Sequence, residues 1–277
     1  MLSKVSETAL ITLNSRVAEA RKANPVIVDP EGERLLAKLA IMLPGDLRAR
    51  LIDRAMPASL SRHIALRARQ YDSYARAFLR ENPQGLVVNL GGGFDTRFWR
   101  LSAAPERFLE VDLPPVIELK RQLLGGDPPY RMIAGSVLER NWMEAVLEKR
   151  NQDILFLAEG LLMYLPKPDV TGLFRGLSGS FSRSFLVFET VHERYVRGVW
   201  HKMLEAKMKR SLGCGAGASF QFGIRDASEI EAYAPGIKVL EEWSYFEEED
   251  LKPAVLRLFR HWKFVSRTQW TIRAAIG

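Results

Sequence analysis

The sequence predicts an α/β fold in which a mostly parallel sheet follows a purely helical N-terminal region. Residues 5–82 place apolar side chains at helical spacing. From residue 85 onward, short apolar runs alternate with amphipathic segments, which is typical of parallel strands joined by helices. The first apolar run, Leu86–Leu90, leads directly into three glycines, Gly91 to Gly93. The 277 residues contain no repeat and no low-complexity linker, so we expect a single domain.

The N-terminal region is predicted to contain four helices, at residues 5–22, 33–42, 46–55 and 59–81, which are separated by proline-containing breaks. A helical segment beside a ligand-binding sheet can close over the ligand and shape the substrate pocket. The alternative is that these helices only cover one face of the sheet. We expect residues 1–82 to form such a helical cap and residues 83–277 to form the core of the same domain.

The core is predicted to contain five parallel strands followed by an antiparallel pair. The parallel strands are Leu86–Leu90, Phe108–Asp112 and residues 130–134, 153–159 and 184–189, and the helices between them are Pro114–Leu124 and residues 139–149 and 169–177. A long basic helix over residues 192–210 should lead into a glycine-rich stretch around Cys214, and residues 192–225 could form a lid. After a helix at 226–233, antiparallel strands at 238–246 and 263–276 complete the sheet.

The junction between the first strand and the next helix predicts a nucleotide-cofactor site. Glycines there allow a sharp turn and a close approach by a ligand. Asp112 ends the second strand 21 residues after Gly91, close to the spacing of an acid that binds ribose hydroxyls. A dinucleotide motif would have a third glycine where this chain has Thr96, and Asp95 would repel a pyrophosphate. These two residues favour a cofactor that carries positive charge, such as S-adenosylmethionine.

Several polar side chains are expected along one rim of the sheet. Ligands of open α/β sheets bind outside the carboxyl ends of the strands. The strand pattern places Gly91, Asp112, Leu138 and Glu159 at those ends. The rim is therefore the predicted cofactor site.

The glycine stretch at residues 89–100, NLGGGFDTRFWR, resembles the motif of the leucine carboxyl methyltransferase family, which includes methyltransferases that resemble the tetracenomycin polyketide O-methyltransferase. The resemblance continues at residues 110–114, EVDLP, and 158–165, AEGLLMYL, and also at residues 6–10 and 64–69. These blocks cover roughly residues 6–190. The resemblance implies a class I, S-adenosylmethionine-dependent methyltransferase with a Rossmann-like sheet, which is mostly parallel with an antiparallel C-terminal strand.

The resemblance also implies roles for individual residues. Gly91 and Gly93 would admit the cofactor and Asp112 would bind its ribose, while Leu138 is expected to bind the cofactor from its place on the rim. Glu159 and Arg67 would hold the amino-acid end, supported by Asp95. The family usually has an acidic residue where this chain has Val137, so either the backbone and Ser136 hold the adenine or the register differs by one residue.

The methyl acceptor is expected to be a small molecule with a carboxylate or an aromatic hydroxyl. A carboxylate needs no general base because it is ionised at neutral pH, whereas a phenol benefits from one. His192 directly follows the fifth strand, and Tyr164 lies in the loop after Glu159, so these two are the candidate catalytic residues. Other side chains that could act as a base are His63, His201, His261 and Tyr195, and Trp200 is the tryptophan that could contact an aromatic substrate.

Composition limits the other classes of function. A single cysteine excludes an intramolecular disulfide, and no apolar run reaches about 18 residues, so we expect a cytoplasmic protein without a membrane span or a signal peptide. The net charge of +7 suggests nucleic acid or an anionic small substrate, but the basic residues are scattered and no zinc spacing or RNA-binding signature accompanies them. We therefore expect an anionic or aromatic small-molecule acceptor and no metal, while a protein acceptor stays open.

Three alternatives remain on the sequence alone. An NAD-dependent oxidoreductase is disfavoured by Asp95 and Thr96. A catalytically inactive methyltransferase fold could bind a partner protein, although Gly91, Asp112 and Glu159 are all present. An RNA methyltransferase is suggested only by the positive net charge.

Overall fold

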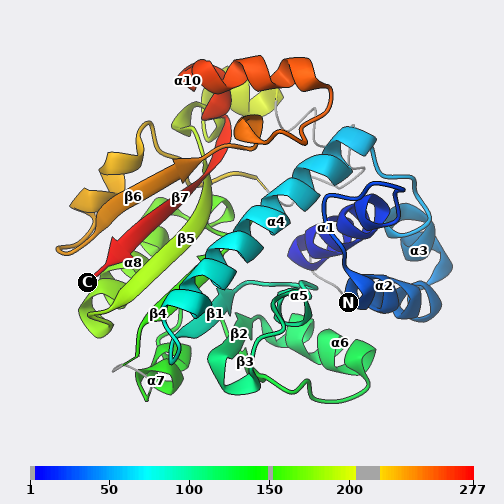
Figure 1. Ribbon diagram of the computed structural model, residues 1–277, viewed down its shortest axis with the longest axis horizontal. Helices are drawn as coiled ribbons and strands as arrows, with labels where there is room; N and C mark the ends of the chain where they lie inside the picture. Colours follow the sequence, from blue (N-terminus) through cyan, green and yellow to red (C-terminus); the bar gives the residue numbers. More distant parts are fainter. Residues whose placement is uncertain (1–3, 149–151, 204–218) are drawn as a thin grey trace.

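The structure is a computed structural model that describes residues 4–148, 152–203 and 219–277. Its centre is a seven-stranded sheet with the order β3-β2-β1-β4-β5-β7-β6 (Figure 1). The strands are β1 (Leu86–Leu90), β2 (Phe108–Asp112), β3 (Arg131–Ala134), β4 (Ile154–Ala158), β5 (Ser184–Val191), β6 (Lys238–Trp243) and β7 (Gln269–Ile276). Strands β1 to β5 pair in parallel, and β7 pairs antiparallel with both β5 and β6. The predicted sheet is thereby confirmed.

Helices cover both faces of the sheet. They are α1 (Lys4–Ala20), α2 (Pro30–Met42), α3 (Gly45–Leu51), α4 (Ala58–Glu81), α5 (Arg97–Leu101), α6 (Pro114–Leu124), α7 (Asn141–Leu147), α8 (Lys167–Ser180) and α10 (Lys263–Ser266). In Figure 1, α4 runs diagonally across the sheet and separates β5–β7 from α1, α2 and α3. Within the described residues, no helix has both the length and the apolar character needed to cross a membrane.

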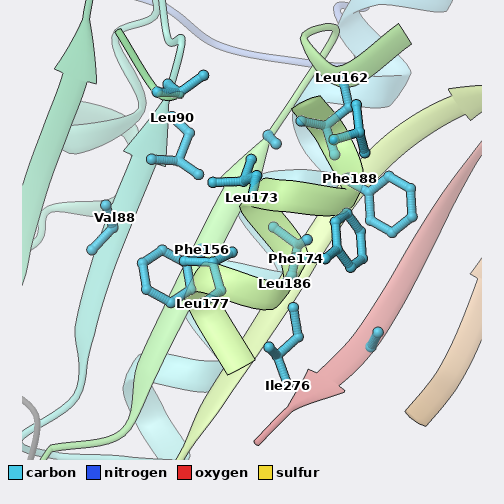
Figure 2. Packing of buried hydrophobic residues seen from close by; sticks show 14 of the residues in the cluster. Val88, Leu90, Phe156, Leu162, Leu173, Phe174, Leu177, Leu186, Phe188 and Ile276 are labelled. Atoms are coloured by element: carbon cyan, nitrogen blue, oxygen red, sulfur yellow. The ribbon is translucent and has the colours of Figure 1, made fainter. Parts of the chain in front are cut away.

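The period of two along each strand divides the core into two layers. Val88 and Phe156 point to one face, where they pack with α8 residues such as Phe174 (Figure 2). Their chain neighbours Val87 and Leu155 point to the other face and pack under α4 and α5. Both faces are buried, which explains why these strands are continuous apolar runs in the sequence.

The N-terminal helices have a core of their own that joins the glycine loop. Leu10 and Leu13 of α1 pack with Leu35 of α2, and all three are fully buried. Phe94, which follows the three glycines, inserts into this same cluster and is only 1% exposed. The loop is therefore clamped between the sheet and α1.

Some predicted elements were wrong in type or extent. The predicted helix at 192–210 begins only at residue 198 and is helical to residue 203, where the described segment ends, because β5 continues to Val191 and His192 forms an isolated bridge with Ile224. The predicted helix at 226–233 is a 3₁₀ helix, Ala227–Ala232, capped by Asp226. The predicted strand at 263–276 begins only at Gln269, since Lys263–Ser266 is helical. Residues 204–218 of the proposed lid, including Cys214, lie outside the described residues.

Candidate functional site

A cavity of about 310 Å³ lies at the carboxyl ends of the central strands. Seven of the nine predicted site residues line it: Arg67, Gly91, Gly93, Asp95, Asp112, Glu159 and Tyr164. They come from α4, the glycine loop, the last residue of β2 and the loop after β4, which are separated in the sequence but meet at this rim. The rim predicted from the strand pattern therefore borders this cavity, and part of the cavity wall is charged.

Two predicted site residues do not belong to the cavity lining. Leu138 is 40% exposed, while its neighbours Ser136 and Val137 do line the cavity. His192 lies at the end of β5, where its Nδ1 accepts a hydrogen bond from the backbone N–H of Arg194 at 3.3 Å. Burial, together with the nearby Arg194 guanidinium, lowers the pKa of His192. The predicted roles of Leu138 in cofactor binding and of His192 in catalysis stay predictions.

The glycine loop has a conformation that favours glycine. Gly91 and Gly93 have φ angles of 61° and 57°, in the left-handed region. A Cβ on Gly91 would lie 2.8 Å from the Leu161 side chain, and one on Gly93 would lie 2.8 Å from the Ala9 Cβ. The loop is thus packed against both the β4 loop and α1, as well as bordering the cavity.

We expect Gly93→Ala to destabilise the protein by about 1–2 kcal/mol, because it combines an unfavourable φ with contact against Ala9. The matched control is Gly172→Ala in α8, where a Cβ would meet nothing within 4 Å of the described structure. Gly172→Ala should instead raise the free energy of unfolding, by at most about 1 kcal/mol, since alanine favours a helix. Urea unfolding measures both. Equal effects at the two positions would contradict the strain at Gly93.

Asp112 is held by the loop that it faces. Its Oδ2 accepts a hydrogen bond from the Gly93 N–H at 2.6 Å, and its Oδ1 accepts one from the Leu113 N–H at 2.7 Å. Burial raises the pKa of Asp112, although these two hydrogen bonds favour the ionised form. A carboxylate has about four acceptor positions, so Asp112 keeps capacity for hydroxyl groups in the cavity.

A buried set of ion pairs, which we call the central ion network, forms part of the cavity wall and extends behind it. Its members are Arg16, Asp29, Arg67, Asp72, Asp95, Arg97, Arg100, Glu159 and Glu189. Arg97 is at its centre and only 1% exposed. Its guanidinium bonds to Asp72 at 2.8 Å and Asp95 at 2.6 Å, and also to Glu159. Burial opposes the charged form of Arg97, but these carboxylates outweigh it and raise its pKa.

Arg67 joins the two glutamates at the other end of the network. Its Nε donates to Glu159 and its Nη1 to Glu189, both at 2.8 Å. Burial would raise the pKa of Glu159, but the guanidinium groups of Arg67 and Arg97 lower it below the usual value. The Nη2 of Arg67 lies beside Gly160, where a Cβ would approach it to 3.4 Å. The missing side chain at Gly160 leaves that edge of the guanidinium next to the cavity.

The sequence reasoning missed several residues of this site. Arg16, Asn89 and Arg97 line the cavity, and none of them was predicted to. Asn89 and Arg97 lie inside the glycine motif, so their position beside Gly91 was an available signal. Arg16 gave no such signal, because its place depends on how α1 docks onto the glycine loop, where it donates to the Phe94 carbonyl at 3.1 Å.

His63 lies one turn before Arg67 on α4 and packs against the Tyr245 ring, with ring centroids 4.2 Å apart. Burial, reinforced by the Arg67 charge, lowers the pKa of His63 to about 3. Between that value and about 6.5 the unfolded chain therefore binds a proton that the native state does not. Stability should fall as the pH drops through this window, by up to about 1.4 kcal/mol per pH unit.

The variant His63→Phe should show a shallower loss of stability between pH 6.5 and 4 than the wild type, because the titrating group is gone. Urea unfolding at several pH values measures the slope. The control is His261→Phe at an exposed position, which should keep the wild-type slope. A wild-type slope in His63→Phe would mean that His63 is not held neutral.

The remaining wall of the cavity comes from the loop after β4 and from the segment before residue 225. Tyr164 lies in the 3₁₀ turn Leu162–Tyr164, and its ring packs 5.4 Å from that of Phe220. Gln221 donates from Nε2 to the Tyr164 carbonyl at 2.9 Å. Leu161 and Leu165 add apolar surface. This wall differs from the charged one and suits the less polar part of a ligand.

The sequence of this chain is similar to those of known methyltransferases. A family model described as leucine carboxyl methyltransferase matches residues 9–178. The tetracenomycin polyketide synthesis O-methyltransferase TcmP of Streptomyces glaucescens is 31% identical over 255 residues, which are 91% of this chain and 87% of that protein. The S-adenosyl-L-methionine-dependent methyltransferase dpfgK of Gibberella zeae is 28% identical over 254 residues, which are 87% and 82% of the two chains.

The fold is similar to that of a solved SAM-dependent methyltransferase from Anabaena variabilis. The TM-score is 0.50 at 12% sequence identity, and the match covers 88% of this chain and 93% of that one. Together with the mostly parallel sheet and its antiparallel C-terminal strands, this likeness confirms the predicted class I methyltransferase fold.

Proposed function

The chain belongs to the leucine carboxyl methyltransferase family, and we propose that it transfers a methyl group from S-adenosylmethionine to an oxygen atom of a small molecule. The methyl donor predicted from the sequence agrees with the family and with the descriptions of its relatives. The observation that carries the proposal is that Gly91, Asp112, Arg67 and Glu159 line the same cavity. S-adenosylmethionine supplies an activated methyl group on a positively charged sulfur.

The residues of the cavity fit the parts of this donor. Asp112 retains acceptor capacity for ribose hydroxyls, as described above. The Nη2 edge of Arg67 is available to a carboxylate beside Gly160, and Glu159 to an ammonium group. Ser136 and Val137 line the neighbouring wall after β3, where an adenine would lie if Asp112 holds the ribose.

The charge of the central ion network supports the same donor. The network contains five carboxylates and four guanidinium groups, so it carries one negative charge in excess when all are ionised. S-adenosylmethionine carries a sulfonium, an ammonium and a carboxylate, a net charge of +1. In a buried site a charge of either sign needs compensation. A negatively charged pyrophosphate would add to the excess instead of balancing it.

Calorimetric titration of the purified protein with S-adenosylhomocysteine, with NAD as the parallel ligand, tests this proposal. We expect micromolar binding of S-adenosylhomocysteine and no heat of binding with NAD. S-adenosylhomocysteine lacks the sulfonium charge, so sinefungin, which carries an amine in its place, should bind at least as tightly. Absence of binding by both methyl-donor analogues would reject the proposed function.

A further inference from the structure

A histidine and a serine outside the predicted site form a hydrogen-bonded pair at the apolar wall of the cavity. The Nε2 of His201 lies 3.2 Å from the Oγ of Ser219, and Ser219 lines the cavity. The other ring nitrogen, Nδ1, lies 2.9 Å from the backbone carbonyl of Tyr195. Both residues are partly buried. The pair thus reaches from the cavity into the protein.

The carbonyl partner determines which way this pair is oriented. A backbone carbonyl can only accept a hydrogen bond, so the Nδ1 of His201 must carry the proton and donate it. In the neutral ring, Nε2 is then the acceptor, and the Ser219 hydroxyl donates to it. The remaining lone pairs of Ser219 Oγ can accept a hydrogen bond from a hydroxyl group in the cavity. Protonation of Nε2 would leave the Tyr195 contact intact.

We propose that Ser219 and His201 remove the proton from a hydroxyl acceptor during methyl transfer; this rests on the proposed function. The acceptor oxygen forms a bond to the methyl carbon, and the carbon–sulfur bond breaks with its electron pair remaining on sulfur. The acceptor's proton passes to Ser219 Oγ while the Ser219 proton passes to His201 Nε2. His201 then releases that proton to solvent, so the reaction yields the methyl ether, S-adenosylhomocysteine and one proton.

This arrangement favours one class of acceptor among those that the family allows. A carboxylate is already ionised at neutral pH and has no proton for the pair to remove. A phenol or enol must lose its proton as the new bond forms, and a positioned base assists that loss. Ser219 is therefore the catalytic residue, and His201 is the residue that positions Ser219 and accepts its proton. The acceptor is a compound with an aromatic or enolic hydroxyl.

The geometry of the pair can be tested without a substrate. Nitrogen-15 NMR of the histidine rings should show His201 as the Nδ1–H tautomer in its neutral form, with an Nε2 resonance that shifts in Ser219→Ala and is kept in Ser219→Thr. The exposed His261 provides the reference, because Ser219 does not contact it within the described structure. An Nε2–H tautomer, or an Nε2 resonance that is unaffected by Ser219→Ala, overturns the pairing.

The acceptor class is tested with 3-hydroxy-2-naphthoic acid, which presents a hydroxyl and a carboxyl on one aromatic ring system, and isotopically labelled S-adenosylmethionine. We expect label in a base-stable ether. Ser219→Ala and His201→Gln should each lower kcat about 100-fold or more, with KM changed only a few-fold. Ser219→Thr should restore most of the rate, and His261→Gln should match the wild type.

The other possible results contradict either the inferred acceptor class or the proposed function. Label only in a base-labile ester shows that the carboxylate is the acceptor and overturns the inference while supporting the proposed function. Protein that binds S-adenosylhomocysteine but methylates neither group also overturns the inferred acceptor class. Protein that binds no methyl-donor analogue fails at the earlier step, the proposed function itself.

Discussion

Arg97→Ala is expected to lower the free energy of unfolding by about 3–5 kcal/mol. Arg97 is 1% exposed and bonds to Asp72, Asp95 and Glu159. Removing it leaves these carboxylates buried with fewer partners, and an uncompensated buried charge is costly. Urea unfolding followed by circular dichroism measures the loss. Arg97→Lys should also destabilise, because one ammonium group cannot reproduce the fork of a guanidinium that bonds to several carboxylates.

The control for Arg97 is Arg80→Ala, at the exposed end of α4. The Arg80 side chain is 73% exposed and lies 3.6 Å from Glu81. Exposed ion pairs contribute little, so the free energy of unfolding should change by about 0.5 kcal/mol or less. If Arg97→Ala behaved like this control, the central ion network would not stabilise the fold, and the charge argument for the methyl donor would lose its basis.

Asp112→Ala should weaken S-adenosylhomocysteine binding by about 1–3 kcal/mol, which is about 5- to 150-fold in Kd. The substitution removes the expected acceptor of the ribose hydroxyls. It also removes the hydrogen bond that holds Gly93 at 2.6 Å, so the loop would be less ordered before binding. Asp112→Asn keeps one oxygen acceptor and should show a smaller loss. Calorimetric titration measures all three proteins.

The matched control is Asp127→Ala, since the Asp127 side chain is 78% exposed and does not line the cavity. Its affinity for S-adenosylhomocysteine should equal that of the wild type. Unchanged affinity in Asp112→Ala, with a normal unfolding transition, would remove the ribose assignment while leaving the other cavity contacts to explain binding.

The sheet could be predicted from the sequence because its signals are local. Leu86–Leu90 and residues 154–158 are apolar runs of strand length, and prolines or glycines bound most of the neighbouring helices. The secondary structure of the region after β5 was harder to predict. Val191 pairs with Gln269 of β7 and His192 with Ile224, and both partners lie far along the chain. The start of the predicted helix was therefore placed too early, and in the described residues the helix covers only 198–203.

The site divides in the same way. Gly91, Gly93 and Asp112 are recognisable by spacing, because one βαβ unit contains all of them. The contacts of Arg97 could not be recognised by spacing, because its partner Asp72 comes from α4 and is 25 residues away in the sequence. His201 was one of several candidate bases, but its pairing with Ser219 could not be predicted, since nothing local to either residue indicates that they meet. Hydrogen bonds between side chains of different helices and strands depend on how these elements pack together, and the spacing of residues in the sequence does not show that packing.

The place of β7 in the sheet has a consequence for biosynthesis. β7 follows β6 in the chain but lies between β5 and β6, and pairs with β5 along its whole length, from Ser184 to Val191. A nascent chain that has not yet produced β7 therefore presents β5 with one open edge, and the buried residues Leu186 and Phe188 lack their partners Ala274 and Ile272, respectively. Open apolar edges of this kind attract other chains. Between the translation of β5 and that of β7 we therefore expect the growing polypeptide to associate more readily with other chains through this edge.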